Sequence, residues 1–216
     1  MYATRKTYKN LALFDFDGTL YPGDSFTGFI FYTRSKRHII KNGLKILPWI
    51  QAYYLKLYPA RSMRPKLFSA IFSQTTLSEL TPIIPDYAQY LISRLDEKMY
   101  QQLLKHQQHG DDVVLVSASI DLYLETVCQL LNIDLICSET ERIGHTLTGK
   151  YNTPDCSEAQ KSLRIQERYS LEKYQYIYAY GNSEEDRAML ELADFPYMVG
   201  TDKQLPTVQS KIKRGA

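Results

Sequence analysis

The sequence has no long hydrophobic run, which argues against a membrane-spanning helix. Its apolar stretches fall well short of the roughly 18 residues that crossing a bilayer requires. The first ten residues are polar and basic, and the apolar run after them, residues 11–14, is too short for a secretion signal. Three cysteines are present, an odd number without metal-site spacing: Cys128, Cys137 and Cys156. We therefore expect reduced thiols and a cytoplasmic protein.

Acidic residues are missing from one long segment. No aspartate or glutamate occurs over residues 25–78, although the net charge of the whole chain is only +2. The apolar spacing over residues 26–32 and 39–57 is typical of helices rather than strands, and prolines punctuate the segment. We expect an all-helical insertion over residues 22–90. Its basic residues are Arg34, Lys36, Arg37, Lys41, Lys45, Lys56, Arg61, Arg64 and Lys66.

The stretch after the first ten residues combines a strand signal with two carboxylates. The apolar run predicts a buried strand over residues 11–16. Asp15 and Asp17 lie at its end, and alternate residues of a strand point to the same side. Two crowded carboxyl groups need a cation between them to ionise together, and without such a cation one group holds a proton. The pair predicts a cation site or a nucleophile with an acid–base partner, and an ordinary turn is the alternative.

Other predicted strands also end in polar residues. Residues 112–116 form a β-branched run followed by Ser117, Ala118 and Ser119, where a hydroxyl and main-chain N–H groups could bind phosphate. A helix N-cap is the alternative interpretation of these serines and of Asp121. Residues 176–180 alternate and are followed by a Gly-Asn-Ser sequence. The remaining predictions are helices over 87–109, 121–131 and 157–169, the last capped by Ser157, a hairpin over 138–151, an edge strand over 195–199 and a basic tail over 211–214.

Four of these stretches together resemble the motifs of the haloacid dehalogenase-like (HAD) superfamily. They are DFDGTL from Asp15, VSAS ending at Ser119, a lysine near a helix start at Lys161, and GNSEED containing Asn182. The chain is most similar to subfamily IB, the phosphoserine-phosphatase-like group. The resemblance implies an α/β fold with a Rossmann-like three-layer core and a parallel sheet, formed by residues 1–21 and 91–216. It also implies an inserted all-helical cap over residues 22–90.

The resemblance further implies the roles of individual residues. Asp15 would be the nucleophile that becomes an aspartyl-phosphate, and Asp17 the general acid and base. The Mg²⁺ ligands would be Asp15, Asp17 and Asn182. The substrate phosphate would be bound by Ser117, Ala118 and Lys161. Asp186 and Ser183 would hold the metal ligands in position without binding the ion themselves.

Two positions depart from the family pattern. The pattern often has glycine four residues before its lysine, where this chain has Ser157, so Lys150 is a competitor of Lys161 for the phosphate. The last motif usually has aspartate where Asn182 stands. Asparagine keeps the oxygen but loses a charge, and we therefore expect weaker Mg²⁺ binding rather than none.

The sequence thus predicts an Mg²⁺-dependent phosphomonoester hydrolase acting through an aspartyl-phosphate, with a small phosphorylated substrate selected by the basic, aromatic cap. One alternative is a phosphatase of lipid phosphates, such as phosphatidylglycerol phosphate, with the cap in peripheral contact with an anionic membrane. The basic face of the cap is otherwise a solvated surface. A second alternative is a non-catalytic protein that binds phosphate or nucleic acid. The Asp15/Asp17 pair argues against pure binding and makes a nucleic-acid partner unlikely.

Overall fold

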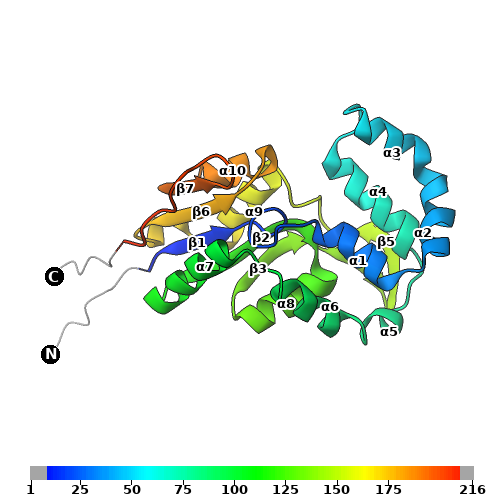
Figure 1. The fold of residues 1–216 in the computed structure, drawn as a ribbon, viewed down its shortest axis with the longest axis horizontal. Helices are drawn as coiled ribbons and strands as arrows, with labels where there is room; N and C mark the ends of the chain where they lie inside the picture. The colour runs from blue at the N-terminus through cyan, green and yellow to red at the C-terminus, as the bar shows by residue number, and fades with distance from the viewer. Residues whose placement is uncertain (1–8, 210–216) are drawn as a thin grey trace.

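A five-stranded parallel sheet lies at the centre of the computed structural model, which describes residues 9–209 (Figure 1). The strand order is β3-β2-β1-β6-β7, and every neighbouring pair is parallel. The predicted α/β fold is therefore confirmed. The tail predicted over residues 211–214 lies outside the described residues. The strands are β1 (Leu11–Phe14), β2 (Asp112–Ile120), β3 (Asp134–Ser138), β6 (Ile177–Gly181) and β7 (Phe195–Met198).

Helices cover both faces of this sheet and give three layers. In β1, Ala12 and Phe14 belong to one hydrophobic cluster, which includes side chains of α6, α7 and α8. Leu11 and Leu13 belong to a second cluster with α9 and α10. Alternate side chains of a strand point to opposite faces, so all four residues of β1 are buried. The helices are α6 (Ile84–Ile92), α7 (Glu97–His109), α8 (Asp121–Leu131), α9 (Ala159–Arg168) and α10 (Arg187–Leu190).

The helices that follow β1 stand at one end of the sheet, at the right of Figure 1. We call α1–α4 the cap helices. The helical stretch predicted over residues 39–57 is divided into α2, a 3-10 turn over Leu44–Ile46 and α3, with Pro48 in the first turn of α3. The cap helices are α1 (Ser25–Thr33), α2 (Lys36–Gly43), α3 (Leu47–Tyr54) and α4 (Ala60–Phe72), and the short α5 (Leu77–Leu80) follows them.

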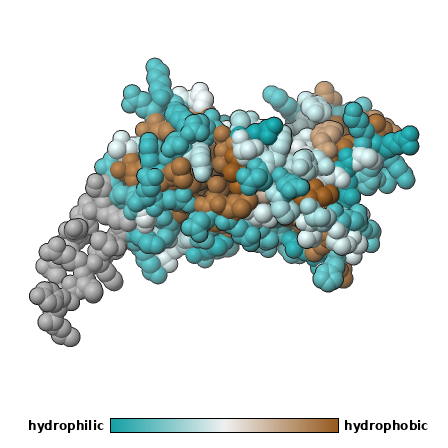
Figure 2. All heavy atoms as spheres, turned by 60° about the horizontal axis from the view of Figure 1, so that its bottom comes forward, coloured by the Kyte–Doolittle hydropathy of each residue, from teal (hydrophilic) through white to brown (hydrophobic). Residues whose placement is uncertain are grey.

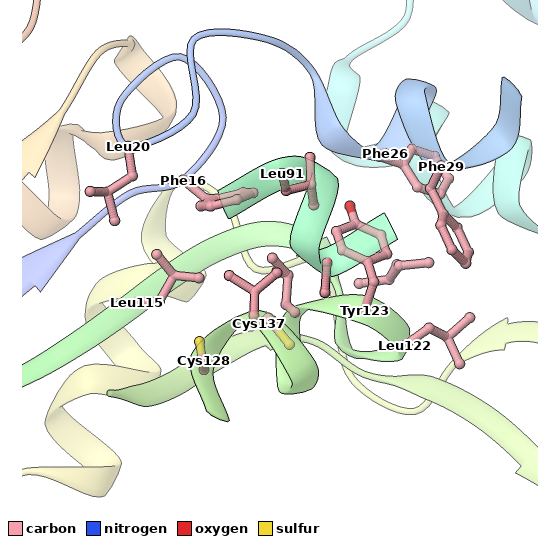
Figure 3. Close-up of a cluster of buried hydrophobic side chains, with 14 of the residues drawn as sticks. Phe16, Leu20, Phe26, Phe29, Leu91, Leu115, Leu122, Tyr123, Cys128 and Cys137 are labelled. Carbon is pink, nitrogen blue, oxygen red and sulfur yellow. The ribbon is translucent and has the colours of Figure 1, made fainter. Parts of the chain in front are cut away.

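Aromatic packing fixes the cap helices to the core. The ring of Phe29, on α1, lies 4.9 Å from that of Tyr123 on α8 and 5.6 Å from that of Phe72 on α4. In Figure 3, Phe26 and Phe29 of α1 lie beside Tyr123 in the same buried cluster. Because such rings each bury a large apolar area, this cluster holds α1 over the carboxyl ends of the strands.

A β-hairpin packs against α4, the last of the cap helices. It consists of β4 (Thr140–Ile143) and β5 (Thr146–Tyr151), an antiparallel pair as predicted over residues 138–151. Helix α4 packs against β5, and Thr76 forms an isolated bridge with Thr146. A Cβ atom at Gly149 would lie 2.8 Å from that of Ser73, and its φ is +87°, so only glycine suits this close approach.

Two local predictions were wrong. Strand β1 ends at Phe14 rather than at residue 16, because the Phe16 carbonyl accepts hydrogen bonds from the N–H groups of Thr19 and Tyr21 and so forms a turn. Ser157 does not cap α9. The N-cap residue is Glu158, without a side-chain cap bond, and the buried Ser157 hydroxyl has no hydrogen-bond partner.

Two further sequence features concern thiols and membranes. Cys128, Cys137 and Cys156 are all buried and unpaired. Within residues 9–209, no helix combines the length and the apolar character that crossing a bilayer requires.

Candidate active site

The turn after β1 brings Asp15 and Asp17 to the carboxyl edge of the sheet. The Asp15 N–H continues the strand ladder by donating to the Tyr180 carbonyl at 2.9 Å. Gly18 then turns the chain with a φ of +83°, and a Cβ atom there would lie 2.0 Å from the Asn182 side chain. Glycine is therefore required both for the left-handed conformation and for the approach of this turn to Asn182.

Lys161, on the first turn of α9, lies at the centre of the charged groups. Its Nζ donates to Asp15 Oδ1 and to Asp186 Oδ1, both at 2.6 Å, and to the Val116 carbonyl at 2.9 Å. All three ammonium protons therefore have acceptors. Burial favours the neutral amine, but the two carboxylates outweigh it and raise the pKa of Lys161.

Asp15 accepts on both carboxylate oxygens. The Thr19 hydroxyl donates to Oδ2 at 2.9 Å, on the side away from Lys161. Burial raises the pKa of Asp15 to about 7, against the opposing effect of the Lys161 ammonium. The Lys161 ammonium stabilises the ionised form, and a further positive charge beside Asp15 would favour the carboxylate more strongly.

Asp17 is held by a different set of donors. Its Oδ1 accepts from the Ser25 N–H at 2.7 Å, and its Oδ2 accepts from the Ser119 hydroxyl at 2.5 Å. Ser25 begins the first cap helix, and its hydroxyl in turn lies 2.8 Å from that of Tyr123. Burial raises the pKa of Asp17 to about 6, although the bonds from Ser119 and Ser25 lower it. Near neutral pH this carboxyl group can therefore both hold and release a proton.

The end of β2 supplies hydroxyl groups to the same place. Strand β2 continues to Ile120, beyond the predicted end at residue 116, so Ser117 and Ser119 are part of the strand. Neither serine caps α8, whose N-cap residue Ile120 makes no side-chain bond. Asp121 does not cap it either, because it accepts from the Thr140 hydroxyl at 2.7 Å and pairs with Arg142.

The loop after β6 is organised by Asp186. Its Oδ2 accepts from the N–H groups of Asn182 and Ser183 at 2.9 and 3.0 Å and from the Ser183 hydroxyl at 3.2 Å. Burial alone would raise the pKa of Asp186, but Lys161 and the two N–H groups lower it below its usual value. This carboxylate holds both the loop and the ammonium of Lys161 in place.

Oxygen atoms converge around the Asn182 amide. In one orientation of this amide, its Nδ2 donates to Asp186 Oδ2 at 3.2 Å and to the Asp17 carbonyl oxygen at 3.3 Å. In the other orientation the amide oxygen faces the same two oxygens and accepts from the Thr19 hydroxyl at 3.4 Å. That second arrangement is favourable only if a cation lies among the oxygens.

A cavity of about 700 Å³ connects these groups with the cap helices. All the site residues predicted from the sequence line it, whereas the competitor Lys150 is exposed and does not. The cap side of the cavity is mainly apolar and includes Phe26, Ile30, Ile50, Met63 and Leu67. A more open depression of about 1120 Å³ beside β3 shares no residue with this site.

Sequence reasoning missed the roles of four residues. They are Thr19, Ser25, Arg64 and Ser119, the last of which was considered as an N-cap residue and not as a partner of Asp17. Arg64, on α4, makes two 2.8 Å bonds to Asp155, on the loop before α9, and one of 2.9 Å to Glu185. The absence of acids from residues 25–78 was the available signal, because a buried arginine in that segment must find its carboxylates elsewhere.

Comparisons with known proteins agree with this geometry. The family model described as haloacid dehalogenase-like hydrolase matches residues 12–191. The chain is 26% identical, over 91% of its own length and 93% of the relative, to a histidinol-phosphatase of Neisseria meningitidis serogroup C (strain 8013). A Bordetella pertussis Tohama I crystal structure has a TM-score of 0.74 at 22% identity, covering 88% of this chain and 89% of that one. A phosphoserine phosphatase with a phospho-aspartyl intermediate analogue has a TM-score of 0.59 at 16% identity, covering 88% and 85%.

Proposed function

This chain belongs to the haloacid dehalogenase-like hydrolase family and is a phosphatase, and we propose that it hydrolyses phosphoric monoesters through a covalent phosphate on Asp15. The observation that carries the proposal is the buried Asp15–Lys161 pair, with 2.6 Å between Oδ1 and Nζ, at the edge of a cavity. An ion pair that served only stability would not need to line a cavity. A nucleophile and the cation that offsets substrate charge do.

The chemistry follows from the two aspartates. The Asp15 carboxylate attacks phosphorus, and the bond from phosphorus to the leaving oxygen breaks. The leaving oxygen takes the proton of Asp17. Asp17 then accepts a proton from the water that attacks the aspartyl-phosphate, which releases inorganic phosphate and restores Asp15. A pKa of about 6 suits Asp17 to both proton transfers.

Three groups would bind the substrate phosphate. Lys161 offsets its negative charge, while the Ser117 hydroxyl and the Ala118 N–H at the end of β2 can donate to its oxygens. Ser117 is buried and its oxygen accepts from the Ser119 N–H at 3.1 Å, which leaves its proton free to donate into the cavity. The competing Lys150 is too exposed to supply this charge in a low-dielectric site.

The donor set suits Mg²⁺. Two carboxylates, Asp15 and Asp186, share the Lys161 ammonium, and the Asp17 carboxyl group lies close to Asp15, so a further positive charge is favourable here. We expect the Asp15 carboxylate, the Asp17 main-chain carbonyl and the Asn182 amide oxygen to hold the ion, with Ser183 and Asp186 fixing the loop behind them. Within the described residues no group of three or more His, Cys, Asp or Glu side chains could hold a metal, so main-chain and amide oxygens are needed. When bound, Mg²⁺ would polarise the phosphate and offset its charge.

The lining of the cavity indicates which kind of substrate can bind. Its apolar cap side favours a monoester whose leaving group has an apolar portion, which supports a lipid phosphate as a second candidate beside a soluble phosphomonoester. Histidinol phosphate, the substrate in the name of the Neisseria relative, and phosphoserine are soluble candidates. A non-catalytic phosphate binder is disfavoured, because binding alone needs no carboxylate directed at the phosphate.

A substrate panel with one variant tests the proposal. We expect Mg²⁺-dependent release of phosphate from 4-nitrophenyl phosphate and from one or more of the candidate monoesters, abolished by EDTA. Asp15→Asn should remove turnover and leave thermal unfolding largely unchanged. A radiolabelled substrate should label the wild-type protein, and hydroxylamine should release the label, as expected of an acyl phosphate. Wild-type turnover by Asp15→Asn would exclude Asp15 as the nucleophile.

A further inference from the structure

One part of the cap exposes an unusual number of large hydrophobic side chains. We call residues 36–57 the cap tip; it contains α2, the 3-10 turn and α3. Helix α3 has no buried residue. Eight of the fourteen large hydrophobic residues that are exposed in the described part of the chain belong to the cap tip: Ile40, Leu44, Leu47, Trp49, Tyr53, Tyr54, Leu55 and Leu57.

Several of these side chains are largely exposed to solvent rather than partly covered by neighbouring groups. Tyr54, Leu55 and Leu57 expose 78, 69 and 77% of their surface. In Figure 2 hydrophobic atoms reach the surface at the cap end of the molecule, on the right, among hydrophilic ones. Eight large hydrophobic side chains exposed within one short segment are more than isolated surface residues, and such a concentration marks a site of interaction with a protein or a membrane.

The charge of the cap tip distinguishes between these partners. Of the nine basic residues in the acid-free segment, Arg34, Arg61 and Arg64 pair with carboxylates outside it, and the Lys66 ammonium lies 3.9 Å from the centre of the Trp49 ring. The other five form no ion pair within residues 9–209: Lys36, Arg37, Lys41, Lys45 and Lys56. Every one of these five lies in the cap tip.

We propose that the cap tip binds the surface of an anionic lipid bilayer. Leucine, isoleucine, tryptophan and tyrosine side chains suit the boundary between headgroups and acyl chains, and unpaired lysines suit anionic headgroups. A nucleic acid would match the charge but leave the leucines in water. A protein partner would need carboxylates and an apolar face side by side. An anionic bilayer offers negatively charged headgroups and an apolar acyl region over its whole surface.

The cap tip also connects this surface with the active site. Ile39, Gly43, Ile50, Tyr53 and Tyr54 line the cavity that reaches Asp15. A segment in contact with lipid on its outer side therefore forms one wall of the cavity. If the proposed function holds, a lipid with a terminal phosphate monoester can enter with its phosphate toward Asp15 and its apolar portion against the cap.

The single tryptophan of the chain makes a direct test possible, because Trp49 lies in the cap tip. The full-length protein is mixed with phosphatidylcholine vesicles that either contain or lack phosphatidylglycerol. We expect co-sedimentation with the anionic vesicles only, weakened by salt. We also expect Trp49 emission to shift to shorter wavelength and to be quenched by brominated acyl chains.

Two cap-tip variants and two matched controls localise the binding. Leu55→Ser with Leu57→Ser should weaken vesicle binding at least about tenfold, since both side chains leave the apolar boundary. Lys36→Gln with Lys41→Gln should weaken it roughly fivefold for each lysine. The controls change exposed residues elsewhere, Ile143→Ser with Leu163→Ser and Lys173→Gln with Lys203→Gln, and should stay within about twofold of wild type. Far-ultraviolet circular dichroism and thermal unfolding verify that each variant is folded.

Three results would overturn the proposal. They are an unchanged Trp49 emission without co-sedimentation at low salt, equal losses in the control variants, or a Trp49 shift that needs no vesicles and follows protein concentration. The last result would assign the surface to a second copy of the chain. The assay needs no turnover, so Asp15→Asn should bind vesicles like wild type. Vesicle binding without phosphatase activity would retain the cap-tip assignment and remove the proposed function.

Discussion

The guanidinium of Arg64 binds both carboxylate oxygens of Asp155, from Nε to Oδ2 and from Nη2 to Oδ1, each at 2.8 Å. Arg64 belongs to α4 of the cap, and Asp155 to the core loop before α9. Nη2 also donates to Glu185 at 2.9 Å, on the loop after β6. One cap side chain therefore connects the loop that leads into α9, the helix of Lys161, with the loop that carries Asn182. The Asp155 side chain is only 4% exposed and depends on this arginine for charge compensation.

We expect Arg64→Lys to loosen the cap and to lower kcat/KM about tenfold, because misplacing the cap and the two loops weakens the positioning of substrate. A single ammonium cannot bind two carboxylate oxygens in the planar arrangement that the guanidinium provides. Arg64→Met should go further and lower the free energy of unfolding by roughly 3 kcal/mol, because it leaves a buried carboxylate unpaired. Hydrogen exchange of α4 and urea unfolding measure the two effects.

Arg61 supplies the matched control for Arg64. It lies on the same helix and pairs with Glu158, but its side chain is 58% exposed. Surface pairs contribute at most about 1 kcal/mol, so Arg61→Lys should change neither α4 exchange nor kcat/KM appreciably. Equal effects of the Arg61 and Arg64 substitutions would show that Arg64 has no particular role in positioning the cap.

The positions of Asp15, Ser117 and Asn182 could be predicted because each follows a strand signal. Parallel strands end at the same edge of a sheet, so local pattern alone brings these residues together. Spacing could not distinguish Lys161 from Lys150. The path of the β4–β5 hairpin and the start of α9 decide which ammonium is buried, and both depend on packing that no local pattern encodes.

The supporting residues could not be predicted for a related reason. Ser119 and Asp17 are 102 positions apart, and Arg64 and Asp155 are 91 apart. Ser119 and Asp17 meet because β1 and β2 are neighbouring strands that end at the same edge of the sheet. Arg64 meets Asp155 only because α4 is packed over the strand ends. Serine and arginine are common at surfaces, so their sequence gives no sign that a distant carboxylate needs them.

Lys161→Met should lower kcat roughly a hundredfold or more, because under the proposed function it removes the charge that offsets both the phosphate and Asp15. It also leaves the Asp15 and Asp186 carboxylates without their shared cation, so a lower melting temperature is expected and must be measured beside the kinetics. Lys150→Met, at an exposed position, is the control and should leave both quantities unchanged. Loss of activity in Lys150→Met and not in Lys161→Met would reverse the assignment of the phosphate lysine.

Asn182→Asp should tighten Mg²⁺ binding and destabilise the metal-free protein. Two opposite unit charges about 4 Å apart attract by roughly 4 kcal/mol at an effective dielectric near 20, an upper guide since the carboxylate is also desolvated. Without metal, the new carboxylate would face the oxygens of Asp17 and Asp186 and could not donate to them as the amide does. We therefore expect a lower melting temperature in EDTA and a larger rise on adding Mg²⁺.

The exposed Asn152 provides the control for this substitution. Asn152→Asp adds the same charge away from the oxygen cluster, and its melting temperature should respond to Mg²⁺ as wild type does. If Mg²⁺ stabilises Asn182→Asp no more than wild type, Asn182 is not part of a metal site. Because melting temperature is the readout, this result does not depend on knowing the substrate.

A buried polar network behind β6 makes the stability depend on pH. Asp111 Oδ2 lies 2.8 Å from His106 Nδ1, and Oδ1 lies 2.7 Å from His109 Nδ1. His106 Nε2 lies 2.8 Å from the Tyr180 hydroxyl, which also accepts from Gln102 at 2.9 Å. Burial would raise the pKa of Asp111, but the bonds from the two histidines outweigh it and lower the pKa below 3.8.

The lowered pKa fixes the sign of the effect. Ionised Asp111 stabilises the fold above its unfolded pKa of about 3.9, and this contribution is lost as the pH falls through the lower folded pKa. Asp111→Asn should therefore lower the free energy of unfolding by roughly 2 kcal/mol near neutral pH, and its difference from wild type should shrink below about pH 4. Urea unfolding across this range measures both quantities. Asp86→Asn, at an exposed position of α6, should show no such difference. A wild-type-to-Asp111→Asn difference that grows on acidification would mean that the histidines do not hold Asp111 in its ionised form.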